Sequence, residues 1–208
     1  DVNELNVDLL SLAANTFYGP KGAAALYIRK GVRIQPLLDG GIQERGLRAG
    51  TENVPAIVGM GVAAEIAKRE MASRILHLQE LRDRLMRELP ARIPHTILLG
   101  HPTNRLPNNV SVAIDYVEGE SMLLFMDMDG IKISSGSACV SRSLKVSHVM
   151  LAMGISSATA QGSLVFTFGI QNTHEDVDRV LEALPPVVQR LRDMSPLYHK
   201  AMRARSGA

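Results

Sequence analysis

The strongest constraint on this fold is one long segment, residues 55–89, in which apolar side chains recur at the spacing of a helix face. Asn53 is suited to cap its start, Pro55 fits the first turn, and Pro90 is expected to end it. The recurring apolar positions are Ile57, Ala64, Ile66, Ala67, Met71, Ile75, Leu78, Leu81, Leu85 and Leu89. Because a helix of this length can link two domains, we place a boundary near residue 70 and expect domains over residues 1–70 and 71–208.

The first domain is predicted to contain two short strands joined by a turn. Residues 7–12 and 23–29 are apolar with little alternation, which predicts buried strands, the second covered on both faces. Residues 18–22 form the turn between them. Since the polar residues 1–6 lead at once into the apolar run, we expect the chain to be a piece of a longer protein.

The second domain is predicted to alternate strands and helices, which gives an α/β class with mixed strands. Strands are expected over residues 96–99, 109–114, 131–133 and 163–168, and helices over residues 119–128, 147–153 and 173–194. In the final helix, Thr173 and Asp176 form a variant of the capping box.

Composition excludes several function classes for the 208-residue chain. Lys and Arg total 23 against 21 Asp and Glu, with no basic run and no Trp, which argues against a nucleic-acid partner. A single cysteine excludes an internal disulfide and a multi-cysteine zinc site, and it points to a reducing compartment, which we take to be the cytoplasm. The best apolar run, Val54–Ala64, is too short for a membrane span and contains Pro55.

The single thiol, Cys139, has two interpretations. A lone cysteine is commonly a small buried hydrophobe. Here it lies in a loop of small residues, 134–143, which offers no apolar cage, and Arg142 and Lys145 favour the reactive thiolate. The residues alone leave both a structural and a functional thiol open.

Two other segments have a binding interpretation beside a simpler one. Residues 15–22 follow a strand, where α/β proteins bind ligands, although a plain turn is the better explanation. Residues 48–53 open the long helix with a Gly and a Thr that suit a phosphate, although they also suit simple N-capping. The six histidines show no metal-ligand spacing, and Asp127 with Asp129 indicates a solvated turn rather than a metal pair.

Taken together, the motifs resemble the C-terminal half of NifS/IscS-type cysteine desulfurases, in the class V aminotransferase superfamily. The matching segments are Tyr18-Gly19-Pro20-Lys21-Gly22, Gly40-Gly41-Ile42-Gln43-Glu44-Arg45-Gly46-Leu47-Arg48-Ala49-Gly50-Thr51, Pro107-Asn108-Asn109-Val110-Ser111, Glu118-Gly119-Glu120-Ser121, Ser135-Gly136-Ser137-Ala138-Cys139 and Ser195-Pro196-Leu197. Their order and spacing follow the family along nearly the whole chain.

The resemblance implies a pyridoxal phosphate enzyme of fold type I that works as a homodimer. On this basis the first domain is the end of the large cofactor-binding domain, and the second is the small C-terminal domain that carries the cysteine loop. Family enzymes convert L-cysteine to alanine and leave a persulfide on the loop cysteine, which matches Cys139. The persulfide passes to an iron–sulfur scaffold protein or another acceptor, and Thr51 matches the threonine that reaches the cofactor phosphate of the neighbouring subunit.

Three departures from the family pattern put its activity in doubt. The family has His-Lys before the turn, and that lysine holds the cofactor covalently; here the pair is Asn15-Thr16, as in a lysine-less branch of the family. Lys21 stands at a different position and is not expected to substitute. The arginine that binds the substrate carboxylate falls on Val165. The N-terminal half, with the His, Asp and Gln that contact the cofactor ring, is absent from this sequence.

These observations leave three hypotheses. The first is a cysteine desulfurase homologue in iron–sulfur cluster assembly, impaired by Thr16 and Val165. The second is a non-catalytic sulfur carrier or scaffold-docking protein, in which Cys139 binds sulfur or the edge of a cluster. No other residue is expected to bind a metal. The third is a truncated product without function of its own. Family placement favours the first, whereas the retained cysteine beside the lost lysine and arginine favours the second for the chemistry.

Overall fold

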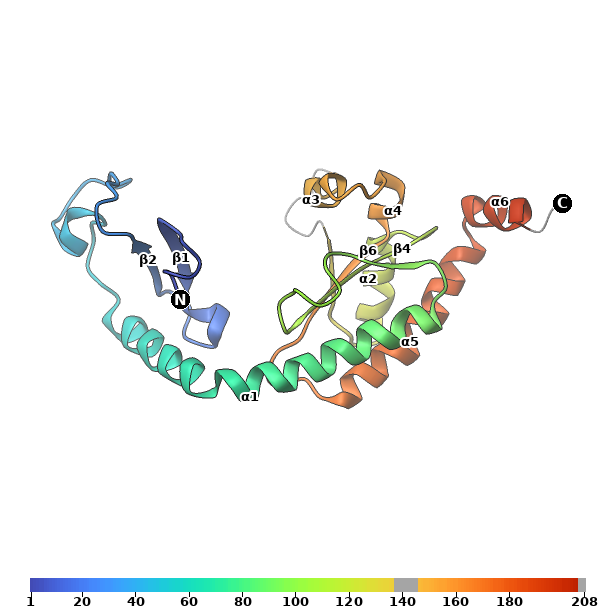
Figure 1. Ribbon diagram of the computed structural model, residues 1–208, viewed down its shortest axis with the longest axis horizontal. Coiled ribbons are helices and arrows are strands. Elements are labelled where there is room, and N and C mark those ends of the chain that lie inside the picture. Colours follow the sequence, from blue (N-terminus) through green and yellow to red (C-terminus); the bar gives the residue numbers. More distant parts are fainter. Residues whose placement is uncertain (137–145, 206–208) are drawn as a thin grey trace. The chain divides into compact units, whose positions relative to one another are not determined.

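The computed structural model describes residues 1–136 and 146–205. The described chain forms two compact units, Asp1–Ala72 and Ser73–Ala208, and the long helix α1, Val54–Arg92, contributes residues to both (Figure 1). Each unit is described by itself below.

The first unit is built on an antiparallel hairpin. Strand β1, Leu9–Ala13, pairs with β2, Ala24–Ile28, and the 3-10 helix η1, Ala14–Phe17, follows β1. A second 3-10 helix, η2, spans Gln43–Gly46. Both strands were expected, but their predicted burial is wrong, because most of their residues are exposed. A two-stranded sheet buries little, and the buried hydrophobic cluster of this unit consists of the small residues Ala14, Ala23 and Ala56.

Helix α1 begins where the sequence predicts and ends later. The Asn53 side chain accepts a hydrogen bond from the Ala56 N–H at 3.4 Å, as expected of a cap. The expectation that Pro90 ends the helix is wrong, since the helix includes Pro90 and reaches Arg92. A proline removes only its own N–H, and the next turn is closed by the Ile93 N–H, which donates to the Leu89 carbonyl at 3.0 Å.

The second unit contains a four-stranded antiparallel sheet in the order β3-β4-β6-β5. The strands are β3, Thr96–Leu98; β4, Asn109–Ile114; β5, Ser134–Ser135; and β6, Ser163–Thr167. The expected strand over residues 131–133 is wrong, because pairing with β6 begins only at Ser134. Ile131 and Ile133 instead pack, partly buried, against the core.

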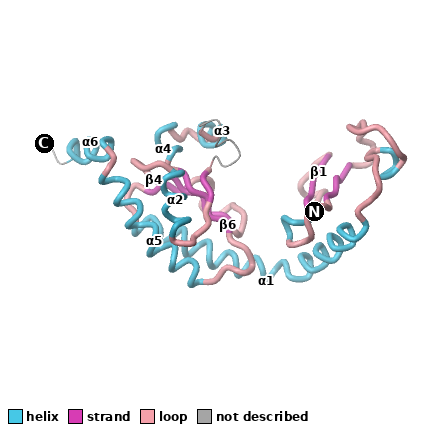
Figure 2. The backbone as a smooth tube through the Cα atoms, turned by 180° about the vertical axis from the view of Figure 1, so that it is seen from behind, coloured by secondary structure: helices cyan, strands magenta, loops and turns pink. Residues whose placement is uncertain are grey.

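Helices cover both faces of this sheet. The C-terminal part of α1, α2 (Gly119–Met128) and α5 (His174–Asp193) enclose the main core, which includes Leu81, Val112, Met122, Leu164 and Leu181. On the other face α3 (His148–Ala152) and α4 (Ser157–Gln161) enclose Leu99, Ala113, Met150 and Ala160. Figure 2 shows the same layers from behind.

The last two helices differ in how well the sequence predicts them. Helix α5 begins with the expected capping box, in which Thr173 and Asp176 satisfy each other's backbone N–H groups. Helix α6, Pro196–Arg205, was not predicted. Its Tyr198 ring lies 5.5 Å from the buried Arg192 guanidinium and 5.6 Å from the Tyr116 ring, and these contacts attach α6 to the unit.

We expect Gly162→Ala to destabilise the second unit by about 2–3 kcal/mol, because a side chain there has no room. A Cβ at Gly162 would lie 2.9 Å from the Val117 carbonyl oxygen and 3.1 Å from the Ile114 carbonyl carbon. Both are backbone atoms, so they cannot move aside like a side-chain end. The shift is measured as a lower midpoint in urea unfolding followed by circular dichroism.

The matched control is Gly61→Ala. Gly61 lies in α1, and a Cβ there meets nothing within 4 Å, so alanine should leave the midpoint unchanged or raise it. Equal midpoints for Gly162→Ala and the unsubstituted chain would contradict the packing argument.

Candidate functional site

Val165, at the position where the family has its carboxylate-binding arginine, lies in the centre of a row across three strands. It is the register partner of Ser111 in β4 and of Ser134 in β5. Because partners in antiparallel strands share a face, the row presents an isopropyl group between two hydroxyls. The neighbours Leu164 and Phe166 belong to the main core, so the row faces the side covered by α3 and α4.

The cysteine loop leaves the sheet on this same face. Gly136 follows β5, and a Cβ there would lie 2.7 Å from the Ser163 hydroxyl and would also collide with the Met150 side chain of α3. Val146, on the other side of the cysteine in the sequence, packs against Met150 and its neighbours. Cys139 itself lies outside the described residues. The structure thus brings both described ends of its loop to the face that carries Val165.

Asn15 and Thr16, at the family's His-Lys position, lie on the exposed 3-10 helix η1. The Thr16 hydroxyl donates to the Ala13 carbonyl at 2.7 Å, so it is engaged within its own turn. Gly19 closes the turn through a hydrogen bond from its N–H to the Ala14 carbonyl, at 2.8 Å. No amine stands at either position, whereas the exposed Lys21 lies four residues beyond the end of η1.

Thr51 is exposed and lies just before α1. The first N–H groups of α1 have partners within the chain: the N–H of Val54 bonds to Glu52, and those of Ala56 and Ile57 bond to Asn53. Pro55 has no N–H. This geometry favours N-capping over an open backbone phosphate site, and it leaves the Thr51 hydroxyl as the group able to meet a phosphate.

Within the first unit, the structure brings the turn and the start of α1 together. A Cβ at Gly59 of α1 would lie 2.8 Å from the Pro20 ring, and one at Gly22 would lie 3.3 Å from the Asn53 amide. The segment after Thr16 therefore packs beside the segment after Thr51. Cys139 and Val165 belong to the second unit.

Among residues 1–136 and 146–205, no three His, Cys, Asp or Glu side chains are grouped so that they could hold a metal ion. Within the same ranges, no helix is both long and apolar enough to cross a membrane. Asp127, which the sequence places in a solvated turn, forms an ion pair with Lys132.

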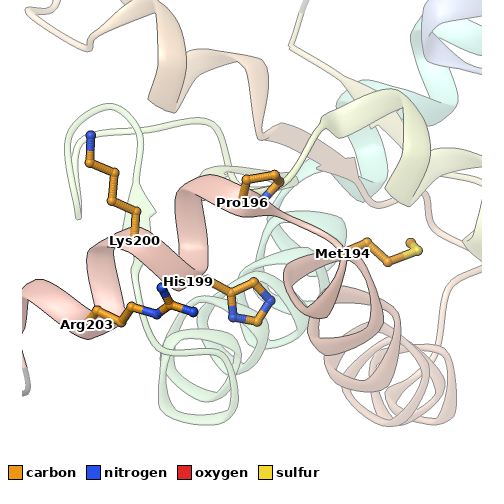
Figure 3. A pocket seen from close by; sticks show the side chains of 5 residues that line it. All are labelled: Met194, Pro196, His199, Lys200 and Arg203. Carbon is orange, nitrogen blue, oxygen red and sulfur yellow. The ribbon is translucent and has the colours of Figure 1, made fainter.

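Sequence reasoning missed an open pocket of about 440 Å³ where α5 meets α6 (Figure 3). Its lining residues are Met194, Pro196, His199, Lys200 and Arg203. His199 Nε2 lies 2.9 Å from the Asp193 carbonyl oxygen, which fixes the ring at the rim. The lining contains two basic side chains, Lys200 and Arg203, and no carboxylate. The spacing of Lys200 and Arg203, one helical turn apart, was the available signal.

Comparison with known proteins finds relatives of one family along nearly the whole chain. The family described as Aminotransferase class-V matches residues 1–180. The cysteine desulfurase IscS of Methanosarcina thermophila is 57% identical over 203 residues, which cover 98% of this chain and 50% of that protein. The cysteine desulfurase NifS of Azotobacter vinelandii is 46% identical, over 95% of this chain and 49% of that protein.

Solved structures agree with these sequence relatives. A NifS-like protein from Rickettsia africae superposes with a TM-score of 0.82 at 27% identity, covering 91% of this chain and 49% of that one. Another NifS-like protein gives a TM-score of 0.79 at 36% identity, covering 91% of this chain and 48% of that one. The chain spans about half the length of the curated relatives it matches. With its mixed α/β units and motifs in family order, the chain belongs to the class V aminotransferase family.

Proposed function

We propose that this chain is a cysteine desulfurase homologue of iron–sulfur cluster assembly and sulfur transfer, in which Cys139 carries the sulfur and desulfurase turnover is impaired. The observation that carries the proposal is the row Ser111-Val165-Ser134. An isopropyl group between two hydroxyls supplies no charge to a substrate carboxylate, whereas an arginine binds one through two parallel hydrogen bonds. Curated relatives named cysteine desulfurase support the family function.

The first unit also supports impaired turnover, because it lacks the lysine that would hold the cofactor. Family membership implies pyridoxal phosphate, but the residue at the family's lysine position does not suit a covalently held cofactor. Thr16 has a hydroxyl in place of an amine, and that hydroxyl is bonded to Ala13. The Thr51 hydroxyl remains available for a phosphate, so any cofactor bound by this chain is held without a covalent bond.

We expect no pyridoxyl adduct after borohydride reduction of the chain in the presence of pyridoxal phosphate. Thr16 cannot condense with an aldehyde, and Lys21 lies in the turn rather than at the lysine position. Peptide mapping by mass spectrometry locates any adduct. Thr16→Lys is the matched variant, in which a specific adduct at residue 16 is expected. A stoichiometric adduct on Lys21 in the unsubstituted chain would refute the prediction.

The alternative is a non-catalytic sulfur carrier or scaffold-docking protein. It is favoured by the retention of Cys139 and of the crowded Gly136 that begins its loop, beside the loss of lysine and arginine. The two functions separate in one experiment. An impaired desulfurase still draws sulfur from L-cysteine, slowly, whereas a carrier accepts sulfur only from another protein or a persulfide donor.

We further propose a cytoplasmic homodimer that docks an iron–sulfur scaffold protein or another sulfur acceptor. Relatives named IscS and NifS support this through the family. Sedimentation equilibrium of the chain tests the dimer, and co-purification with a scaffold protein tests the docking.

A further inference from the structure

A small cavity opens to solvent where the segment before β5, the end of β6 and the start of α5 meet. Its volume is about 230 Å³. That is less than the roughly 300–1,000 Å³ of typical ligand sites, so the cavity suits a small molecule. The pairing of β5 with β6 begins at Ser134 opposite Val165 and does not continue to Lys132 and Thr167, which both line the cavity.

The floor of this cavity is apolar. Phe166, Phe168 and Val180 line it, and all three side chains are buried in the main core. Ile131 and Ile133 line it from the segment before β5 and pack, partly buried, against the same core. Because the core fixes these five side chains, the floor is a preformed apolar surface, which favours a hydrocarbon group over a charged one.

The cavity also contains one carboxylate, that of Asp176 in the first turn of α5. Its Oδ2 accepts two hydrogen bonds at 3.0 Å, from the Asn172 side chain and from the Thr173 N–H. These two bonds lower the pKa of Asp176, so the group is ionised at neutral pH. Both bonds end on Oδ2, and among the described residues the Oδ1 atom has no donor.

One turn further along α5, Arg179 adds a cation to the lining. Its Nη2 donates to the Asp129 carbonyl at 3.2 Å, which holds the guanidinium at the cavity. Within residues 1–136 and 146–205, its other N–H groups have no acceptor. Arg179 is exposed, so a ligand reaches it directly from solvent. The other cation of the lining, Lys132, is already paired with Asp127.

We propose that this cavity binds a small zwitterionic amino acid with an apolar side chain. The ligand's carboxylate pairs with Arg179, its ammonium group with Oδ1 of Asp176, and its side chain lies on the apolar floor. A guanidinium binds a carboxylate through charge-assisted hydrogen bonds, and a carboxylate binds an ammonium group in the same way. The site uses neither Val165 nor Cys139, so it is independent of the proposed desulfurase function.

The test is a titration of the full 208-residue chain with L-valine, followed by the backbone amide signals in NMR spectra. Saturable shifts are expected at Gly130, Thr167 and Arg179, which line the cavity. N-acetylvaline lacks the ammonium group and valinamide lacks the carboxylate. Each should bind about tenfold more weakly than L-valine, because each loses one charge-assisted contact.

Arg179→Gln should weaken L-valine binding by about tenfold, because it removes the partner of the ligand's carboxylate. The matched control is Arg190→Gln on the same helix. Arg190 lies outside the cavity, with its guanidinium 4.9 Å from the Phe125 ring, so binding should be unchanged. Circular dichroism of each variant shows whether the fold is retained.

Three results would overturn the proposal. Absence of a saturable shift in the unsubstituted chain excludes the site, whatever the variants do. Unchanged affinity in a folded Arg179→Gln variant would place the ligand elsewhere. Equal or tighter binding of N-acetylvalinamide, whose two ends are neutral as in a peptide, would replace the free amino acid with a peptide segment.

Discussion

The purified chain, supplied with pyridoxal phosphate and L-cysteine, is expected to release alanine only slowly, near the background rate. Two losses act together. Without an amine at Thr16 the cofactor is not anchored covalently, and without a cation at Val165 the substrate carboxylate loses its charged partner. The carboxylate contact alone is worth about 1.5–3 kcal/mol, or roughly ten- to a hundredfold in rate. The missing lysine lowers the rate further.

The measurement is alanine formation over time, with a full-length cysteine desulfurase run in parallel as the positive control. Val165→Arg is the informative variant, because it restores a charged side chain at the position that Ser111 and Ser134 flank in the sheet. Val165→Arg should strengthen cysteine binding, whereas Val165→Met, of comparable length but uncharged, should not. Robust alanine production by the unsubstituted chain would show that neither the family's lysine nor its arginine is needed.

Sequence patterns predicted best where one element's own residues decide its structure. Strand β4 and helix α2 have the predicted limits, Asn109–Ile114 and Gly119–Met128, because glycine, asparagine and the hydrophobic period mark their ends. The capping box at Thr173 is likewise local. Helix α6 was missed, since Pro196 reads equally as a break and as a first helical turn.

Features that depend on contacts between distant segments could not be predicted from local sequence patterns. The exposure of β1 and β2 reflects what packs on them, and apolar composition alone does not reveal that. The register that sets Val165 between Ser111 and Ser134 joins three separate strands. The contact between Arg105, in the loop after β3, and Met86 of α1 joins two segments that are separate in the sequence. None of these leaves a local sequence signal.

In the folded chain, Cys139 is expected to react with iodoacetamide about as fast as it does in denaturant. The segment from Ser134 to Ser143 consists of small residues with one Val and one Arg, which are too few to form an apolar pocket around sulfur. Arg142 follows three residues after the cysteine, and Lys145 six, so nearby positive charge favours the reactive thiolate. On the Val165 face, Gly136 lies beside Met150, and Val146 packs against the cluster that contains Met150.

The labelling rate separates a sulfur-handling thiol from a structural one. Folded-state labelling slower than denatured labelling by orders of magnitude would identify a buried thiol and remove both sulfur-transfer functions. If labelling is fast, a persulfide donor should transfer its sulfane sulfur to the Cys139 thiolate and leave as a thiol, adding one sulfur atom to the chain's mass. Cys139→Ser should abolish that gain, whereas Ser137→Ala, in the same loop, should leave it intact. Because this transfer needs neither the lysine nor the arginine, it should survive in a chain that releases no alanine.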